Sequence, residues 1–408
     1  MAYRIDQTDA LLQQSWENKL WEESQERDIF TGLVGTYSDK KEMLTDSAVM
    51  RVNMPEGANS HTIGLILDLT GSGRQGAGKV LVGFTESFDT RKYQVYANDV
   101  RHGVDTEQYG RYAQLNSPYK ILEKANPALG KWLKARRGKH AREALLELYS
   151  DNLIETPSSQ TQGWNKNWLV KNVAHSAQPT YDSTLATFTA NITTALVAAG
   201  TAAAAQADIR FFTDLEYFIA TQWKLMPFDD GTYVVTVPAR QAMYLKRFNT
   251  GRNAAADFDS FSSHLGDASV AKYVEAAYGQ YLMKFGKLHL IADDRAPIVN
   301  YNVAAGSITA YYRDVGSTDD RSDITPAAGT DNVYDIGYVI GKGGLTEGVA
   351  MRPRYDDDIT DFNRLRSVGV STTYGFQCTE FDADTATDAT RINQNSAVCA
   401  FYAGAATT

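Results

Sequence analysis

Apolar and polar positions alternate between residues 62 and 70, where Ile63, Leu65, Leu67 and Leu69 are separated mostly by small or polar residues. A period of two predicts a β-strand with one apolar face. A glycine-rich stretch follows, and then KVLVGF and RKYQVYANDV, which favour strands because they are rich in Val, Tyr and Phe. The pattern predicts two strands joined by a flexible, hairpin-like turn, since glycine tolerates the backbone angles of such turns.

The N-terminal part has a different period. Between residues 8 and 24, Leu12, Trp16 and Leu20 recur at every fourth position, which places them on one face of an amphipathic helix. Residues 31–61 contain glycine and proline and show little periodicity, so they are interpreted as an extended arm.

A long helical element is predicted over residues 107–151. Ser117–Pro118 suits its start, because proline is favoured at the first helical position. Asn126–Pro127 predicts a kink or a restart, and Gly138 weakens the middle. The expectation is one long, interrupted helix, followed by a second helical zone at about 183–223.

The C-terminal half mixes strands and helices. GTYVVTVPARQAMYLKRF predicts a strand, a break at Pro238 and a helix, and GKLHLIADDRAPIV predicts a strand and a loop after a helical stretch at 269–283. Residues 314–332 predict a polar, exposed loop before the strand VYDIGYVIG. LRSVGVSTTYGFQCTEFD alternates and is interpreted as the edge of a sheet.

Composition is that of an ordinary soluble globular protein, with 408 residues, of which 43% are hydrophobic and 22% charged. The formal net charge of −9 disfavours a dedicated nucleic-acid binder. Cys378 and Cys399 are too few for a disulfide framework, the N-terminus lacks a signal-peptide core, and the Ala/Thr-rich stretch TANITTALVAAGTAAAAQADI is too weakly apolar for a membrane span. A soluble cytoplasmic protein is expected.

The glycine-rich stretch matches part of a dinucleotide-binding motif, because Gly71, Gly73 and Gly76 have G-x-G-x-x-G spacing. That motif requires a helix after the glycines and a strand that is apolar on both faces. The residues after Gly76 lack helical periodicity, and residues 62–70 are apolar on essentially one face. The dinucleotide interpretation is therefore rejected.

The same stretch matches most of a phosphate-binding loop, through Gly73, Gly78 and Lys79. The next position must be Ser or Thr, whose hydroxyl binds the magnesium ion, but it is Val80. No helix follows to offer its N-terminal amides to phosphate. A nucleotide-binding enzyme that uses residues 71–79 remains only an alternative.

No catalytic or metal constellation is apparent. The histidines are scattered without H-x-x-x-H spacing, no G-x-S-x-G elbow occurs, and neither cysteine has an evident histidine partner. YDDDITDFN concentrates aspartates, but a solvated acidic loop is preferred over a calcium site because the spaced ligands and turn glycine are missing. No cofactor, metal or catalytic residue is expected, and the chain is not expected to be an enzyme.

The run KWLKARRGKHAR places basic residues on the long helix: Lys131, Lys134, Arg136, Arg137, Lys139 and Arg142. A solvated face or a set of partners for acidic neighbours is the favoured interpretation, because the chain is acidic overall. Contact with phosphate stays open as the alternative.

Several segments, in order along residues 20–380, together resemble one known family: LWEESQERDIFTGLVGT, LTGSGRQGAGKVLVGFTESFDTRKYQVYANDVRHGV, LGKWLKARRGKHAREALLEL, YVVTVPARQAMYL, YDIGYVIGKGGLTEGV and DFNRLRSVGVSTTYGF. The chain resembles the phage-capsid-like family related to the major coat proteins of N4-type phages, which has the Hong Kong ninety-seven coat-protein fold. Pro127, the alanine-rich insertion near 195–208, and Val237–Pro238 in place of a common His-Pro depart from that pattern.

The resemblance implies an α+β fold. Its parts would be an N-terminal arm (1–60), an extended β loop (61–92), the first part of a peripheral domain (93–209, with the spine helix at about 117–151), an axial domain (210–350), and a C-terminal return to the peripheral sheet (351–408). The tip of the extended loop would contact a neighbouring subunit through Gly71, Gly73, Arg74, Gln75, Gly76, Gly78 and Lys79.

The function implied is that of a major capsid protein of a tailed double-stranded DNA bacteriophage, which assembles into the hexamers and pentamers of an icosahedral head. Implied partners are other copies of the chain, portal, scaffold and cement or decoration proteins, and packaged DNA through non-specific proximity, with no membrane. The protein would be assembled in the host bacterial cytoplasm and reside in the virion. Another virion structural protein, such as a decoration or tail component, is the alternative.

For a coat protein, the open alternative of phosphate contact gives the basic helix a specific role. Lys131, Lys134, Arg136 and Arg137 would face the capsid lumen, and charge reversal at Arg136 and Arg137 would then impair assembly or packaging.

Overall fold

The computed structural model describes the following residues: 28–37, 46–55, 57–66, 90–105, 121–147, 165, 167–171, 176–177, 192, 194–196, 207, 209–223, 225–249, 281–302, 307–312, 331–360, 365–379 and 398–404. The predicted helix at 8–24 and the predicted loop tip at 71–79 lie outside these residues, as does most of the predicted polar loop at 314–332.

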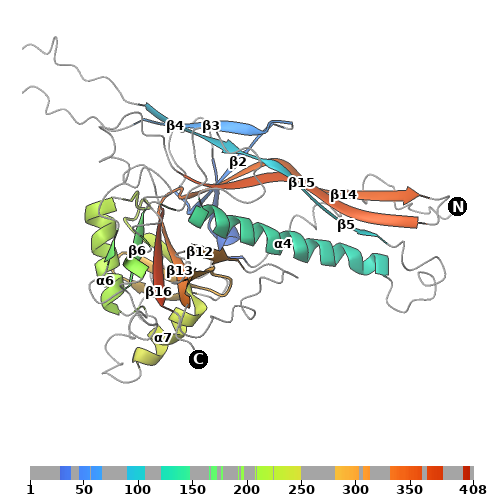
Figure 1. Ribbon diagram of the computed structural model, residues 1–408. Coiled ribbons are helices and arrows are strands. Elements are labelled where there is room, and N and C mark those ends of the chain that lie inside the picture. Colours follow the sequence, from blue (N-terminus) through green and yellow to red (C-terminus); the bar gives the residue numbers. More distant parts are fainter. Residues whose placement is uncertain are drawn as a thin grey trace, which may run out of the picture.

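A five-stranded sheet forms one part of the molecule, in the order β1 (Val34–Thr36), β2 (Val49–Asn53), β14 (Leu345–Thr360), β15 (Leu365–Cys378) and β5 (Asn98–Asp105). β14 and β15 pair antiparallel over almost their whole length and form a long twisted ribbon (Figure 1). β15 is flanked by β14 and β5, so its interpretation as a sheet edge was wrong. Its alternation arises because one face of the sheet packs on the core while the other is more polar.

Helix α4 (Ile121–Glu147) runs alongside this ribbon (Figure 1). It continues through Pro127, so the predicted restart does not occur. Pro127 lies in the second turn, and a proline there removes only one of the helix's backbone hydrogen bonds. Leu129, Leu133 and Leu145 are fully or almost fully buried, and packing of this apolar face outweighs the local cost of the proline.

A second sheet has nine strands. Its main path is β7 (Ser176–Ala177), β6 (Trp168–Val170), β16 (Val398–Gly404), β13 (Asp331–Ile340), β8 (Tyr233–Pro238), β10 (Leu288–Asp293) and β9 (Tyr281–Phe285), while β11 (Ile298–Asn302) pairs with β13 and with β12 (Ser307–Tyr311). Side chains alternate between its two faces. Val234 joins the core beneath α4, whereas Val235 and Val237 join the core beneath α6 and α7.

Helices α6 (Ile209–Phe218) and α7 (Ala239–Asn249) cover the second face, and a π-helical turn, η3 (Ile219–Trp223), extends α6. The predicted succession of strand, break at Pro238 and helix is confirmed by β8 and α7. No helix in the described part of the chain is both long and apolar enough to span a bilayer.

Three further sequence predictions differ from the structure. Residues 281–283, placed at the end of a helix, belong to β9 because Tyr281–Phe285 pairs with β10. Residues 331–332, placed in a loop, begin β13. The aspartates at 356–358, interpreted as an acidic loop, lie in β14, where pairing with β15 extends the strand. The C-terminal strand β16 pairs with β13 and β6 in the nine-stranded sheet, and the division of the chain into domains stays a prediction.

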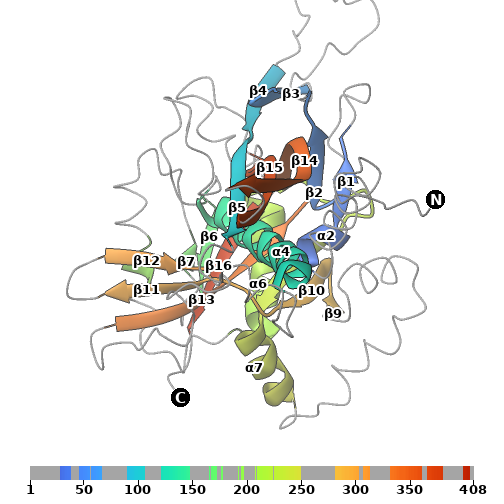
Figure 2. The same cartoon turned by 90° about the vertical axis from the view of Figure 1, so that its right-hand side faces the viewer.

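The strand predicted before the glycine-rich stretch pairs with the one predicted in RKYQVYANDV, while KVLVGF lies outside the described residues. β3 (Ser60–Ile66) and β4 (Thr90–Tyr96) are antiparallel, with Ser60 opposite Tyr96 and Ile66 opposite Thr90. Ile63 is buried against β2 while its neighbours Thr62 and Gly64 are exposed, as the alternation predicts. Figure 2 shows this pair at one end of the molecule, with α7 at the other.

Candidate functional site

The basic run on α4 lies where the helix meets both sheets and the N-terminal residues. A short helix, α2 (Ile29–Gly32), packs against α4. Residues of both sheets belong to the same core cluster as α4. Several basic side chains of the run point into this junction, so their partners decide what the junction can do chemically.

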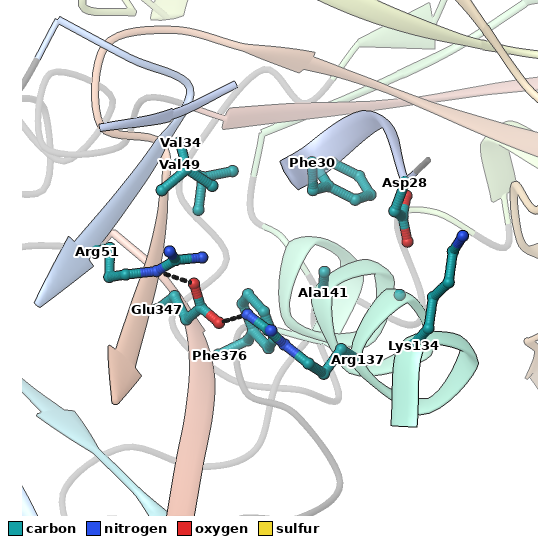
Figure 3. A pocket seen from close by; sticks show the side chains of 11 residues that line it. Asp28, Phe30, Val34, Val49, Arg51, Lys134, Arg137, Ala141, Glu347 and Phe376 are labelled. Atoms are coloured by element: carbon teal, nitrogen blue, oxygen red, sulfur yellow. Dashed lines mark hydrogen bonds and ion pairs between the residues drawn. The ribbon is translucent and has the colours of Figure 1, made fainter. Parts of the chain in front are cut away.

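Arg137 faces the five-stranded sheet. It is 6% exposed and forms an ion pair with the carboxylate of Glu347 on β14, which is 1% exposed. Arg51 on β2 donates to the other carboxylate oxygen from Nε at 2.8 Å (Figure 3). Burial alone would raise the pKa of Glu347, but the two guanidinium groups outweigh it and hold the pKa below its ordinary value. Glu347 is therefore an ionised bridge between α4 and two strands.

Arg142 faces the nine-stranded sheet and uses all five of its N–H donors. Nε and Nη2 donate to the carboxylate of Asp293 on β10 at 2.9 and 2.7 Å. Nη1 and Nη2 each donate to Asp28 at 3.3 Å, and Nη1 also donates to the carbonyl of Gly138 at 2.8 Å. A fully buried arginine with every donor occupied is tolerated, because its desolvation is compensated by these bonds.

His140 lies between these two arginines on α4. Its Nδ1 is 3.0 Å from the hydroxyl of Tyr374 on β15, and the Arg137 guanidinium lies 5.6 Å from the centre of the Tyr374 ring. Burial, together with the charges of Arg136 and Lys139, lowers the pKa of His140 to about 3. The imidazole is therefore neutral at physiological pH, and it serves packing rather than proton transfer.

A small hollow, partly open to solvent, lies beside these groups between α2, β2, α4 and β14 (Figure 3). Phe30, Val34, Val49 and Phe376 give it an apolar lining. Its charged members Arg137 and Glu347 are already paired with each other, so the hollow offers no uncommitted pair for acid–base chemistry. Within the described ranges, no group of three or more His, Cys, Asp or Glu side chains is placed to hold a metal ion.

The structure separates the residues of the predicted basic surface. Lys131 is exposed, Lys134 and Arg136 are half-buried, and Arg137 is buried. The lumen-facing role does not fit Arg137, because Glu347 holds its guanidinium inside the chain. The interpretation of the run as a partner for acidic neighbours fits Arg137 and Arg142.

Sequence reasoning missed the acids that bind these arginines, namely Asp28, Asp293 and Glu347. Two of them carry a local signal, since Asp293 ends the apolar strand LHLIAD and Glu347 interrupts the apolar run GGLTEGVAM. A charged residue within a buried strand requires a partner of opposite charge. Which arginine supplies it depends on contacts between residues far apart in the sequence.

The dinucleotide interpretation of the glycine-rich stretch also fails on topology. A dinucleotide-binding unit places the glycines between a strand and a helix that leads to a parallel strand. β3 instead pairs antiparallel with β4, the next described strand after the stretch.

No protein-family model matches the sequence, and no curated protein matches it either. Solved structures do resemble the fold over nearly the whole chain. The capsid of Ralstonia phage GP4 has a TM-score of 0.59 at 12% sequence identity, with 92% of this chain and 90% of that chain covered. The cyanophage Pam1 capsid has a TM-score of 0.57 at 15% identity, with 94% and 93% covered. The acid-stable capsid of Helicobacter pylori bacteriophage KHP30 has a TM-score of 0.55 at 10% identity, with 93% and 91% covered.

The chain has the Hong Kong ninety-seven-like coat-protein fold. The likeness covers more than nine-tenths of the chain in these comparisons. Sequence identities of 10–15% are low, so similar placement of elements carries the likeness rather than shared residues. The α+β class and the coat-protein fold that the sequence resemblance implied are confirmed.

Proposed function

We propose that the chain is a major capsid protein of a tailed double-stranded DNA bacteriophage. The observation that carries the proposal is the extent of the likeness to phage capsid chains, which covers 92% of this chain and 90% of the Ralstonia phage GP4 capsid chain. Likeness over whole chains of similar length supports a similar role for the subunit, whereas a fold shared by one domain would leave the role open.

The form of the chain supports this role. The β3–β4 pair and the β14–β15 ribbon extend from the body of the molecule (Figure 1), and extended strands expose edges and faces that a neighbouring copy can cover. The charged groups at the centre of the chain are committed to internal ion pairs. The molecule therefore offers surface for association, and we propose that it is not an enzyme.

The division of the chain that the sequence resemblance implied is part of the proposal. The arm would be 1–60 and the extended loop 61–92. The peripheral domain would begin with 93–209, the axial domain would be 210–350, and the C-terminal segment 351–408 would return to the peripheral sheet. On this division β5 and α4 would lie in the peripheral domain, and the strands from β8 to β13 would lie in the axial domain. β16 would belong to the C-terminal segment, and it pairs with β13 and β6.

The proposed partners are other copies of the chain in hexamers and pentamers, together with portal, scaffold and cement or decoration proteins. Packaged DNA would lie close by without specific contacts, and Lys131, Lys134 and Arg136 are the residues proposed to face it. The subunits would assemble in the host bacterial cytoplasm and remain in the virion.

The test is electron microscopy of the full-length chain, expressed alone and purified, together with its mass from light scattering. Closed shells, or rings of five and six subunits, are the expected result. A monodisperse monomer or dimer that remains so at high protein concentration would contradict the proposal. If the chain is instead a decoration or tail component, its copy number in purified virions will fall well below that of the most abundant protein.

A further inference from the structure

Gly138 lies in the interior of α4, where glycine is disfavoured relative to alanine because it increases the freedom of the unfolded chain. A Cβ atom at this position would collide with Oδ2 of Asp28 and lie 3.0 Å from Nη1 of Arg142. The missing side chain therefore leaves a seat on the helix, and the carboxylate of Asp28 occupies it.

Asp28 holds Arg142 less closely than Asp293 does. Both contacts from Arg142 to Asp28 are 3.3 Å, whereas those to Asp293 are 2.9 and 2.7 Å. Asp28 is also the N-cap residue of α2, so it stands at the start of the segment that follows. If Asp28 left its seat, Arg142 would keep its two shorter bonds to Asp293 on β10 and its bond to the Gly138 carbonyl.

The residues that follow Asp28 are held by few regular backbone bonds. α2 has four residues, and β1 has three and lies at the edge of the five-stranded sheet. A small hollow lies beside this segment, lined by Phe30 and Val34 on one side and by Ala141 of α4 on the other (Figure 3). Segments held by few backbone hydrogen bonds at the edge of a sheet open at lower free energy than the core.

Buried apolar side chains should make the segment open as one unit rather than residue by residue. Ile29, Phe30 and Leu33 are only 2%, 3% and 6% exposed, and the Phe30 ring centre lies 5.0 Å from the Arg142 guanidinium. Leaving the seat would expose all three side chains together, so partial fraying is costly. The segment is expected to be either fully docked or fully released.

We infer that residues 28–36 form a strap that closes over α4 and opens as one unit, with Gly138 as its seat, while the Arg142–Asp293 pair stays closed. The strap is a conformational element of the chain itself, and this inference holds whether or not the chain forms capsids.

Amide hydrogen exchange of the full-length chain tests the strap. In Gly138→Ala, the new Cβ displaces Asp28, and exchange at residues 29–36 should become about tenfold faster, a factor that corresponds to about 1.4 kcal/mol. Exchange within α4 and β10 should stay unchanged, because Arg142 keeps Asp293. Asp28→Asn, which keeps the shape of the side chain and removes its charge, should accelerate the same residues.

The matched control is the double variant Asp28→Ala with Gly138→Ala, compared with Asp28→Ala alone. Without the aspartate side chain, the alanine at 138 should cause no further acceleration at residues 29–36. Two results would overturn the inference. One is unchanged exchange at residues 29–36 in both single variants. The other is equal acceleration in the strap, α4 and β10, which would make the contact part of the global fold.

Discussion

At the residue scale, the centre of the molecule depends on charged side chains that are buried in pairs. Glu347 is shared by Arg51 and Arg137, and Arg142 is shared by Asp28 and Asp293. Each carboxylate joins α4 to a different strand or segment, so the pairs set how the helix lies against both sheets. Removal of one partner would leave an uncompensated buried charge, which typically costs 3–5 kcal/mol.

His140 should give the chain a measurable pH dependence. Its pKa is about 3 in the folded chain, and the ordinary value near 6.5 applies to the unfolded chain. Between these values the unfolded state binds the proton, so the free energy of unfolding is highest above pH 6.5 and falls as the pH decreases. The slope should approach about 1.4 kcal/mol per pH unit below pH 6. Urea denaturation of the unassembled full-length chain at pH 7, 6 and 5 measures it.

His140→Asn is the comparison variant, because its amide oxygen can accept a hydrogen bond near the position of Nδ1 but does not titrate. Its stability should vary less between pH 7 and pH 5 than that of the unsubstituted chain. Equal slopes for the two proteins would mean that His140 does not contribute this dependence. At lower pH a further loss is expected, since Asp28 and Glu347 have lowered pKa values and their contribution disappears as they become protonated.

The sequence reveals part of this centre. The basic run on α4 is apparent from spacing alone, and the preference for acidic partners fits Arg137 and Arg142. The burial of Arg137 is not apparent, because Glu347 lies 210 positions away and local sequence says nothing about that contact. For this reason the sequence alone could not separate Arg137 from the residues proposed to face DNA.

At the scale of elements, Gly337 on β13 determines how α6 sits on the nine-stranded sheet. Gly337 pairs with Phe401 on β16, and the Phe401 ring lies 5.5 Å from Phe211 and 6.0 Å from Phe212 on α6, measured between ring centres. The missing side chain at 337 leaves the space that the Phe401 ring fills. Glycine in a central strand marks such a close approach.

Gly337→Ala should therefore destabilise the chain. The added Cβ would collide with the Phe401 ring and lie 2.5 Å from the backbone oxygen of Thr236 on β8. Because the backbone of a central strand cannot move aside easily, a loss of about 1–3 kcal/mol or more in the free energy of unfolding is expected. Urea denaturation followed by tryptophan fluorescence measures it, since Trp223 belongs to the same core cluster.

Gly103→Ala on β5 is the matched control, because its Cβ would meet its nearest atom, the Val368 carbonyl oxygen, at an ordinary 3.5 Å. This variant should change the free energy of unfolding by no more than about 0.5 kcal/mol. If the two variants lose stability equally, then loss of strand glycines in general, rather than the Phe401 contact, accounts for the effect.

Elements with a strong local pattern are predictable from the sequence, and those fixed by pairing are less so. β8 followed by α7, and the β3–β4 pair, match their predictions because Pro238 and the alternating residues specify them locally. The central position of β15 is set by β5, which precedes it by more than 250 residues. Period-two alternation indicates a strand with one apolar face but does not say how many neighbours it has.

At the scale of the whole molecule, the coat-protein fold is carried by the order and placement of elements. Sequence identities to the capsids of similar fold are only 10–15%, and yet more than nine-tenths of the chain is covered. At such low identities a single short motif is a weak indicator of the fold. The resemblance of several segments in the same order indicated the fold, because it reflects the order of the elements along the chain.

The β3–β4 pair permits a sharp test of assembly on this scale. Ile66 and Thr90 lie opposite each other, so a two-residue Asn-Gly turn can join them in place of residues 67–89 without a change of register. The buried contacts of Ile63, Tyr93 and Val95 lie within the retained strands. The shortened chain should therefore keep the urea midpoint of the full chain while losing closed shells, because the segment proposed to reach a neighbouring subunit is gone.

A second variant separates sequence from length. Residues 67–89 are replaced by a Gly-Ser segment of the same length, which preserves reach but removes side chains such as Arg74 and Lys79. If shells form with the Gly-Ser segment but not with the short turn, then assembly requires the length of residues 67–89 rather than their side chains. If shells are lost in both variants, then assembly requires contacts made by the side chains of residues 67–89. Normal shells from the shortened chain would show that assembly does not require this segment, and the intersubunit contacts would then have to come from the β14–β15 ribbon, the N-terminal residues or the nine-stranded sheet.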